Sequence, residues 1–261
     1  MLTDSHCHLD KIDLDPFDGN FGKMLDAAKD ADVGQFLCVC IDTEHFADVL
    51  KPAEDYPNIY CSVGVHPTHQ DSHMPSVDEL IDLAKHEKVI AIGETGLDYF
   101  RCEDEDMTWQ HDLFRTHIRA AIATKKPLII HTRSAKEDTI RILREENAEQ
   151  VGGVMHCFAE DWDTAQKALD LNFYISFSGI VSFNSAKELQ EVAKLVPEDR
   201  FLIETDSPWL APVPKRGRPN QPAYVKYVAE KMADLRGCSY QHIAKVSTQN
   251  FNRLFKINPL S

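Results

Sequence analysis

The sequence has no long hydrophobic run and no excess of basic residues. No apolar stretch approaches the roughly 18 residues that a membrane span requires. The first residues, Met1-Leu2-Thr3-Asp4, have neither the basic nor the apolar region of a secretory signal. Lys and Arg number 28 against 42 Asp and Glu, a formal net charge of −14. A protein that coats duplex DNA needs a basic face, so this class is disfavoured. An enzyme acting on one nucleic-acid end is not excluded, because bound divalent cations would reverse the local field.

Cysteine motifs, glycine-rich loops and serine-nucleophile motifs are also missing. The seven Cys residues include no C-x-x-C pair, which fits reduced thiols, and we expect a cytoplasmic protein. No Gly-rich phosphate loop follows the first apolar segment, as a doubly wound nucleotide-binding sheet would require. No G-x-S-x-G motif is present, so nothing indicates a covalent nucleophile.

Eight short apolar segments recur along the 261 residues and predict strands buried on both faces. They are Leu2–His6, Phe36–Ile41, Tyr60–Val65, Val89–Gly93, Leu128–His131, Gly153–His156, Phe173–Phe177 and Phe201–Glu204. Helical spacing separates them, and three helices are predicted to begin with capping boxes at Ser76, Ser134 and Ser185. This alternation predicts the α/β class, with residues 1–261 forming one (β/α)₈ TIM-type barrel. A doubly wound open sheet is the alternative.

The first strand carries two histidines at alternating positions. Asp4, His6 and His8 share one face of an extended strand, so both imidazoles can reach one metal ion. We expect Asp4 to hold a ring N–H and so fix the tautomer. The alternative is a pair of surface histidines near a frayed terminus.

Four later apolar segments each end in a His or a carboxylate. In a barrel of this kind the carboxyl ends of the strands build the active site, so these side chains are predicted to converge with His6 and His8. They are Glu94, His131, His156 and Asp206. Six such residues at one topological position predict a metal site at the C-terminal rim.

The predicted ligand set suits two divalent ions. His and carboxylate without Cys fit Zn, Mn, Fe, Ni or Mg, and six donors are too many for one catalytic ion with an open position. We assign His6, His8 and Asp206 to one ion and His131 and His156 to the other, with Glu94 bridging and contributing to catalysis. Two ions about 4 Å apart can clamp the attacking and leaving oxygens of a phosphoryl displacement. Asp206 is also the predicted general base for the attacking water.

Further candidates surround this set. Glu204 has the parity of Asp206 and is expected to support the ligands from one layer deeper in the barrel. Arg133 has the parity of His131, and its guanidinium suits phosphate oxygens. The predicted substrate contacts are His66, Arg133, Asp98 and Arg101. A basic loop carries Lys215, Arg216 and Arg218; for it and for His66 a plain surface role is the alternative.

Motifs along the whole chain resemble those of the TatD family of metal-dependent nucleases in the amidohydrolase superfamily. They lie at Asp4–His8, Gly64–Pro67, Gly93–Tyr99, His131–Arg133, His156–Phe158 and Ile203–Pro212. The resemblance implies a (β/α)₈ barrel with a two-metal site and DNase activity, exonucleolytic from 3′ ends in characterised members. The family's metal positions correspond to His6, His8, Glu94, His131, His156 and Asp206. The chain has Ala159-Glu160 where the family often has Ser-Gly, and Asn220-Gln221-Pro222 in place of Asn-Glu-Pro.

The first interpretation is a metal-dependent 3′–5′ exodeoxyribonuclease that uses water activated by two metal ions. Its predicted partner is a nucleic-acid 3′ end, most simply single-stranded DNA, without a membrane or obligate protein partner. The same site would suit a small-molecule amidase, lactonase or phosphotriesterase, or the deacylation of aminoacyl-tRNA. A non-catalytic binding protein is the remaining alternative.

Overall fold

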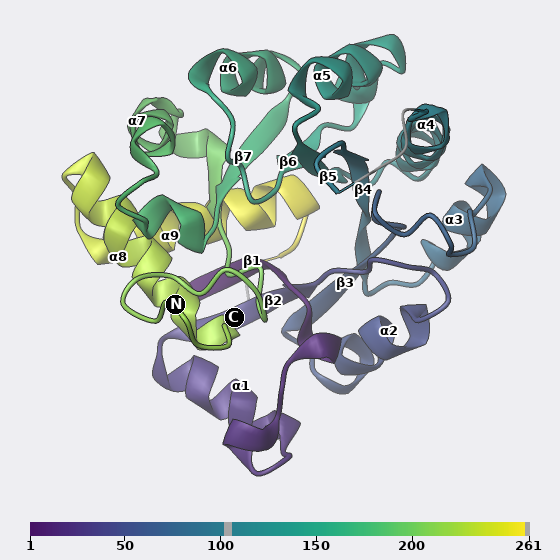
Figure 1. Ribbon diagram of the computed structural model, residues 1–261. Coiled ribbons are helices and arrows are strands. Elements are labelled where there is room, and N and C mark those ends of the chain that lie inside the picture. The colour runs from purple at the N-terminus through teal and green to yellow at the C-terminus, as the bar shows by residue number, and fades with distance from the viewer. Residues whose placement is uncertain (102–105, 259–261) are drawn as a thin grey trace. The chain divides into compact units, whose positions relative to one another are not determined.

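The structure is a computed structural model that describes residues 1–101 and 106–258. Strands and helices alternate along the chain (Figure 1). In the described part of the chain eight strands form one sheet with the sequential order β1 to β8. They are β1 (Leu2–Cys7), β2 (Val33–Cys38), β3 (Ile59–Val63), β4 (Val89–Asp98), β5 (Leu128–Arg133), β6 (Gly153–Met155), β7 (Phe173–Phe177) and β8 (Phe201–Ile203). This order confirms the predicted (β/α)₈ class, whereas the doubly wound alternative is wrong because it needs neighbours that do not follow one another in sequence.

Contacts within the chain divide it into two compact units. The first unit comprises Met1–Leu37, Cys157–Trp162 and Ser176–Ser261, and the second comprises Cys38–His156 and Asp163–Ile175. Each unit is built from segments distant in sequence. The assignment of residues 1–261 to one functional domain stays a prediction.

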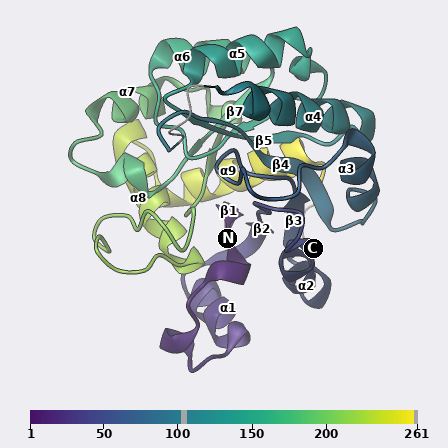
Figure 2. The same cartoon turned by 45° about the vertical axis from the view of Figure 1, so that its right-hand side comes forward.

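In the second unit the strands run parallel, so their carboxyl ends point the same way. β3 pairs with β4, β4 with β5, β5 with β6 and β6 with β7. The strands alternate with helices α2 (Phe46–Asp55), α3 (Val77–Leu83), α4 (Thr108–Thr124), α5 (Lys136–Glu145) and α6 (Trp162–Asp170). α3 and α4 lie side by side (Figure 2). Phe114 and Ile118 of α4 are buried, because they lie on the face of the helix that meets β4.

In the first unit β1 lies beside β8. The N–H of Asp206 donates to the carbonyl of His6 at 3.0 Å, and the N–H of His8 donates to the carbonyl of Ser207 at 2.8 Å. The first and last strands of the order are therefore neighbours, as closure of a barrel requires. The helices of this unit are α1 (Phe21–Asp30), α7 (Lys187–Leu195), α8 (Val225–Arg236) and α9 (Tyr240–Phe255), and α8 packs against α9 (Figures 1 and 2).

Of the three predicted capping boxes, one is present. Ser76 Oγ accepts from the N–H of Glu79, and the Glu79 carboxylate accepts from the N–H of Ser76. The predictions at Ser134 and Ser185 are wrong, because α5 and α7 begin later, with Ala135 and Ala186 at the N-cap. Ser134 has a φ of 55°, which is not the extended conformation that an N-cap adopts. Within the described residues, no helix is both long and apolar enough to cross a membrane.

Candidate metal centre

In the second unit three imidazole rings converge on one carboxylate oxygen, Oε1 of Glu94. The nitrogen atoms are Nε2 of His156 at 2.8 Å, Nδ1 of His131 at 3.2 Å and Nε2 of His66 at 3.2 Å. Glu94 and His131 lie on β4 and β5, and His66 and His156 follow the ends of β3 and β6. The donor atoms of His66, Glu94 and His131 lie within 4.8 Å of one another. Buried nitrogen and oxygen donors without thiolates fit a catalytic divalent ion.

Main-chain hydrogen bonds hold the backbones of Glu94 and His156 in position. The regular pairing of β4 with β5 shifts between Ile92 and Thr95, and Glu94 lies within this irregular stretch. Its N–H donates instead to the carbonyl of Cys40 at 2.9 Å, while the N–H of His156 donates to Ile130 at 3.0 Å. The strands therefore hold both residues by their backbones, which favours a preorganised site.

The imidazole rings around Glu94 lower its pKa. Burial by itself would raise its pKa, but the imidazoles of His156 and His66 and hydrogen bonds from His131 and His156 hold the pKa well below the ordinary value. Burial lowers the pKa of His66 to about 4 despite the nearby Glu94 carboxylate, so this ring is neutral near pH 7. The N–H of Thr68 donates to His66 Nδ1 at 3.2 Å. That contact places the ring proton of His66 on Nε2, which donates to Glu94. A divalent ion bound at Nε2 would take the place of this proton.

Asp98 contacts a predicted ligand. Its Oδ2 lies 3.0 Å from Nε2 of His131, and its Oδ1 accepts from the N–H groups of Phe100 and Arg101 at 3.1 and 2.9 Å. Burial opposes ionisation of Asp98, but the hydrogen bonds from His131 and from the Arg101 main chain lower its pKa. With Nε2 held by Asp98, the Nδ1 atom of His131 is the one that faces Glu94. The role of Asp98 in binding substrate stays a prediction.

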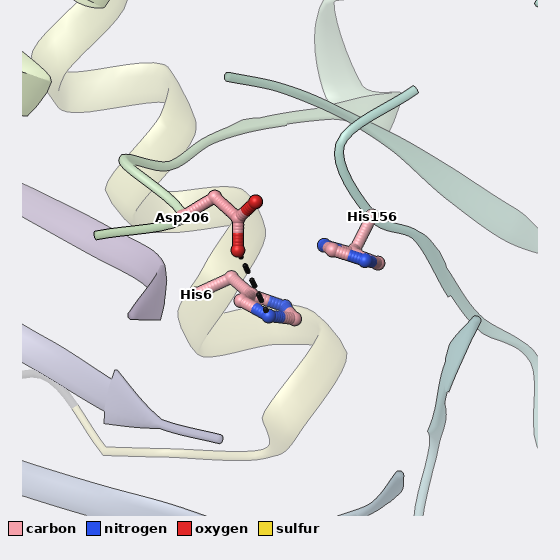
Figure 3. Close-up of side chains that lie close together, drawn as sticks. All are labelled: His6, His156 and Asp206. Carbon is pink, nitrogen blue, oxygen red and sulfur yellow. Dashed lines mark ion pairs between the residues drawn. The ribbon is translucent and has the colours of Figure 1, made fainter. Parts of the chain in front are cut away.

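The first unit contains its own set of three donors. Nε2 of His6 lies 3.3 Å from Nε2 of His8, and these two atoms lie 3.7 and 3.5 Å from Oδ1 of Asp206. Figure 3 shows the carboxylate of Asp206 directed at the His6 ring, with their ion pair dashed. The histidine side chains are 1% exposed, whereas that of Asp206 is 13% exposed. These donors also fit a divalent ion, and Asp206 is the one that solvent reaches most easily.

Two buried carboxylates support the same unit. Asp4 accepts from the N–H and Oγ1 of Thr205 at 2.9 and 2.6 Å and from the His6 N–H at 3.4 Å. Among the described residues its hydrogen bonds thus go to Thr205 and to the His6 main chain, not to the ring contact we expected. Burial raises the pKa of Asp4 to about 8. Glu204 accepts from the N–H of Cys157 at 2.7 Å and from Ser176 Oγ, and so holds the residue that follows His156.

The remaining predicted residues carry positive charge. The guanidinium carbon of Arg133 lies 3.9 Å from the centre of the Phe100 ring. Arg101 is exposed, and its main chain binds Asp98. In the first unit Arg216 and Arg218 are exposed and Lys215 is half-buried. Their contacts with substrate stay predictions.

Two side chains that hold this framework, Gln110 and Asn220, were not among the predicted site residues. Gln110 binds both the N–H and the carbonyl of Asp98, at 2.9 and 3.2 Å. Asn220 donates to the carbonyls of Thr205 and Trp209 at 2.8 and 2.6 Å. Asp98 itself was predicted, as a substrate contact. The signal available for Asn220 was its place in Asn220-Gln221-Pro222, where the family has Asn-Glu-Pro. No comparable signal marks Gln110, because the fold alone brings it to Asp98.

Comparison with known proteins shows which family the chain resembles. The family model described as TatD related DNase matches residues 3–256. YcfH of Escherichia coli K12, an uncharacterized metal-dependent hydrolase, is 46% identical over 99% of this chain and 97% of its own length. YabD of Bacillus subtilis, described in the same words, is 41% identical over 99% of this chain and 100% of its own length.

A solved structure agrees with the sequence relatives. The crystal structure of YjjV, a TatD homolog from Escherichia coli, matches with a TM-score of 0.90 and 28% identity, covering 98% of each chain. The match extends over the segments that carry both sets of donors. The chain therefore belongs to the TatD related DNase family and is a metal-dependent hydrolase.

Proposed function

We propose that this hydrolase cleaves phosphodiester bonds of DNA and removes nucleotides from single-stranded 3′ ends. The observation that carries the proposal is the convergence of three imidazole nitrogens on Oε1 of Glu94. A second set of donors, His6, His8 and Asp206, supports a requirement for two ions. Membership of the TatD related DNase family supports DNA as the substrate.

The chain's own residues would divide the work as follows. Divalent ions held by the two sets of donors would neutralise phosphate charge and make a water molecule more acidic. Asp206 would accept the proton of the attacking water. Its side chain is more exposed than those of His6 and His8, the other two donors of the first unit. Glu94 stays ionised, and Asp98 keeps the His131 ring turned with Nδ1 toward it. The guanidinium of Arg133 would bind a phosphate oxygen.

End-labelled oligonucleotides test the activity. With Mn²⁺ or Zn²⁺, single-stranded DNA labelled at its 5′ end should be shortened stepwise to a ladder of products. The same preparation is assayed on carboxylic esters, lactones and phosphotriesters. Hydrolysis of one of these small substrates without any shortening of DNA would replace the nuclease proposal with a small-molecule hydrolase.

Asp206→Asn separates the predicted base from the predicted ligand. The amide keeps one coordinating oxygen but cannot accept the proton, so kcat should fall by about a hundredfold or more. Bound metal, measured by atomic emission, should fall less than in His6→Ala. Turnover close to that of the unaltered protein, with metal bound, would remove Asp206 from the reaction.

A further inference from the structure

An exposed indole lies beside the donors of the first unit. Trp209 is 48% exposed, and the nearby Leu210 and Val213 are 37% and 45% exposed. Single exposed apolar residues are common on soluble proteins, but a cluster within five positions suggests a binding surface. The Trp209 ring meets the His8 ring edge-on, with centroids 4.9 Å apart and planes at 66°. The main-chain N–H of Trp209 donates to the carbonyl of Asp206 at 3.0 Å.

The backbone around Trp209 is fixed by a buried amide. Asn220 is 2% exposed, and its Nδ2 donates to the carbonyls of Thr205 and Trp209 at 2.8 and 2.6 Å. The N–H of Asn220 donates in turn to Pro208 at 3.0 Å. The backbone that carries the indole is therefore fixed before any ligand arrives, which lowers the entropy lost on binding.

Cations lie on the following loop, and aromatic rings from other segments lie beside them. Lys215 Nζ lies 5.5 and 5.8 Å from the ring centroids of Tyr224 and Tyr227. The guanidinium carbon of Arg216 lies 3.8 Å from the centroid of Phe183, and Arg218 is exposed. In a protein of net charge −14, this cationic loop offers local charge complementarity to an anion. An exposed aromatic face next to cations is the combination that single-stranded nucleic acids require.

We propose that Trp209 is the surface on which a base at the end of single-stranded DNA stacks, while Lys215, Arg216 and Arg218 contact the neighbouring phosphates. This inference rests on the proposed nuclease function and adds to it the groups that would hold the substrate. Stacking needs only the π-face that every base has, so the surface accepts all four bases. It needs an unpaired base, which selects single strands over duplex ends.

Kinetics of three variants test the inference. Trp209→Ala should raise KM for single-stranded DNA about tenfold, within the range of base–aromatic stacking, and Trp209→Phe should recover most of the loss. An oligonucleotide that ends in abasic nucleotides has no terminal base to stack, so its KM should rise far less than the KM of the intact strand in Trp209→Ala. Leu195→Ala, which removes another exposed apolar side chain (54% exposed), is the control and should leave both substrates unchanged.

A binding measurement separates this inference from the proposed function. In EDTA, the anisotropy of a fluorescent single strand should report binding that is about tenfold weaker in Trp209→Ala. An abasic site at the 3′ end should weaken binding to the unaltered protein by a similar factor and leave Trp209→Ala unaffected. Binding without cleavage would refute the nuclease proposal but not the stacking surface. Equal affinity of both proteins for the strand, or equal loss on both substrates, would overturn the role of Trp209.

Discussion

At the scale of single residues, His131 has different partners at its two ring nitrogens, Asp98 at Nε2 and Glu94 at Nδ1. Asp98→Asn removes the charge that orients the ring. Loss of such a partner typically weakens metal affinity about 10- to 100-fold. We expect Asp98→Asn to weaken metal affinity by a factor in this range. Competition with a chelating dye measures it. The control is Asp82→Asn, because Asp82 is exposed and pairs with Lys85 on the surface; equal affinity of the Asp98 and Asp82 variants would contradict the assignment.

A buried histidine away from the donors makes stability depend on pH. His117 is 0% exposed, accepts from the N–H of Val65 at Nε2 and faces the carbonyl of Leu113 with Nδ1. Burial lowers its pKa from 6.5 to about 4. Between these values the unfolded chain binds a proton that the folded protein does not, so stability falls as the pH falls. From this residue we expect a loss of about 3 kcal/mol between pH 7.5 and pH 4.

Urea unfolding of the unaltered protein and of His117→Gln measures this contribution. Gln retains an amide near the position of Nε2 but does not titrate. The fall in unfolding free energy between pH 7.5 and pH 4 should therefore be smaller in the variant. Because the other groups titrate in both proteins, the difference between the two falls reports on His117. Parallel pH profiles would mean that His117 does not titrate as the burial implies.

Residue type and position together predicted which side chains meet within each unit; their role as metal ligands stays a prediction. His6, His8, Glu94, His131, His156 and Asp206 each follow or end an apolar run, and a barrel gathers such positions. The sequence could not predict which nitrogen of each ring faces which carboxylate, because that depends on side-chain rotamers. The contact of His66 with substrate stays a prediction; the sequence did not predict that its Nε2 lies 3.2 Å from Oε1 of Glu94.

At the scale of elements, the close approach of β4 and β5 depends on a glycine. Gly96 pairs with His131 and has a φ of +133°. A Cβ there would collide with the carbonyl oxygen of His131. Gly96→Ala should lower the unfolding free energy by about 1–3 kcal/mol and weaken metal binding by moving His131. Thermal unfolding and a metal titration check both effects.

Gly19→Ala is the matched control for this substitution. Gly19 also has a positive φ, of +68°, but a Cβ there meets nothing within 4 Å. Gly19→Ala should therefore lower the unfolding free energy through backbone strain alone. It should leave metal binding unchanged. If both variants bound metal equally well, the packing of β4 on β5 would not control the position of His131.

The strands were predictable as apolar runs, but their ends were not. β7 has the predicted bounds, Phe173–Phe177, whereas β4 continues to Asp98, five residues beyond the predicted end at Gly93. The pattern failed there because Glu94 and Thr95 interrupt the apolar run. Pairing of Gly96, Leu97 and Asp98 with β5 nevertheless keeps the chain extended. The predicted start of α5 was wrong because Ser134 has a positive φ. The N-cap is therefore the next residue, Ala135.

At the scale of the whole molecule, net charge limits how substrate is held. A chain at −14 repels long duplexes, and the candidate phosphate contacts are few. Affinity falls by about 0.7 log unit per log unit of salt for each phosphate neutralised on a single strand. We expect a shallow slope for binding, equivalent to roughly two or three phosphates. Salt titrations of strand binding measure it.

Topology of the DNA gives a further test at this scale. An enzyme that acts on ends should shorten a linear single strand and leave a covalently closed circle of the same sequence intact. Gel analysis of both forms under identical conditions distinguishes the outcomes. Cleavage of the circle at the same rate, with a steep salt dependence, would indicate an endonuclease with an extended groove.

The discontinuous first unit has a consequence for biosynthesis. Asp4 on β1 binds Thr205, which lies 201 positions later in the chain. Ribosomes add about 5–20 residues per second, so the N-terminal strand waits for its partner for about 10–40 s. During that interval β1 leaves the ribosome without β8 beside it, and its apolar residues Leu2 and Cys7, both fully buried in the finished protein, lack this neighbour. The nascent chain is therefore a candidate client for a chaperone that binds short extended apolar segments until translation has passed Thr205.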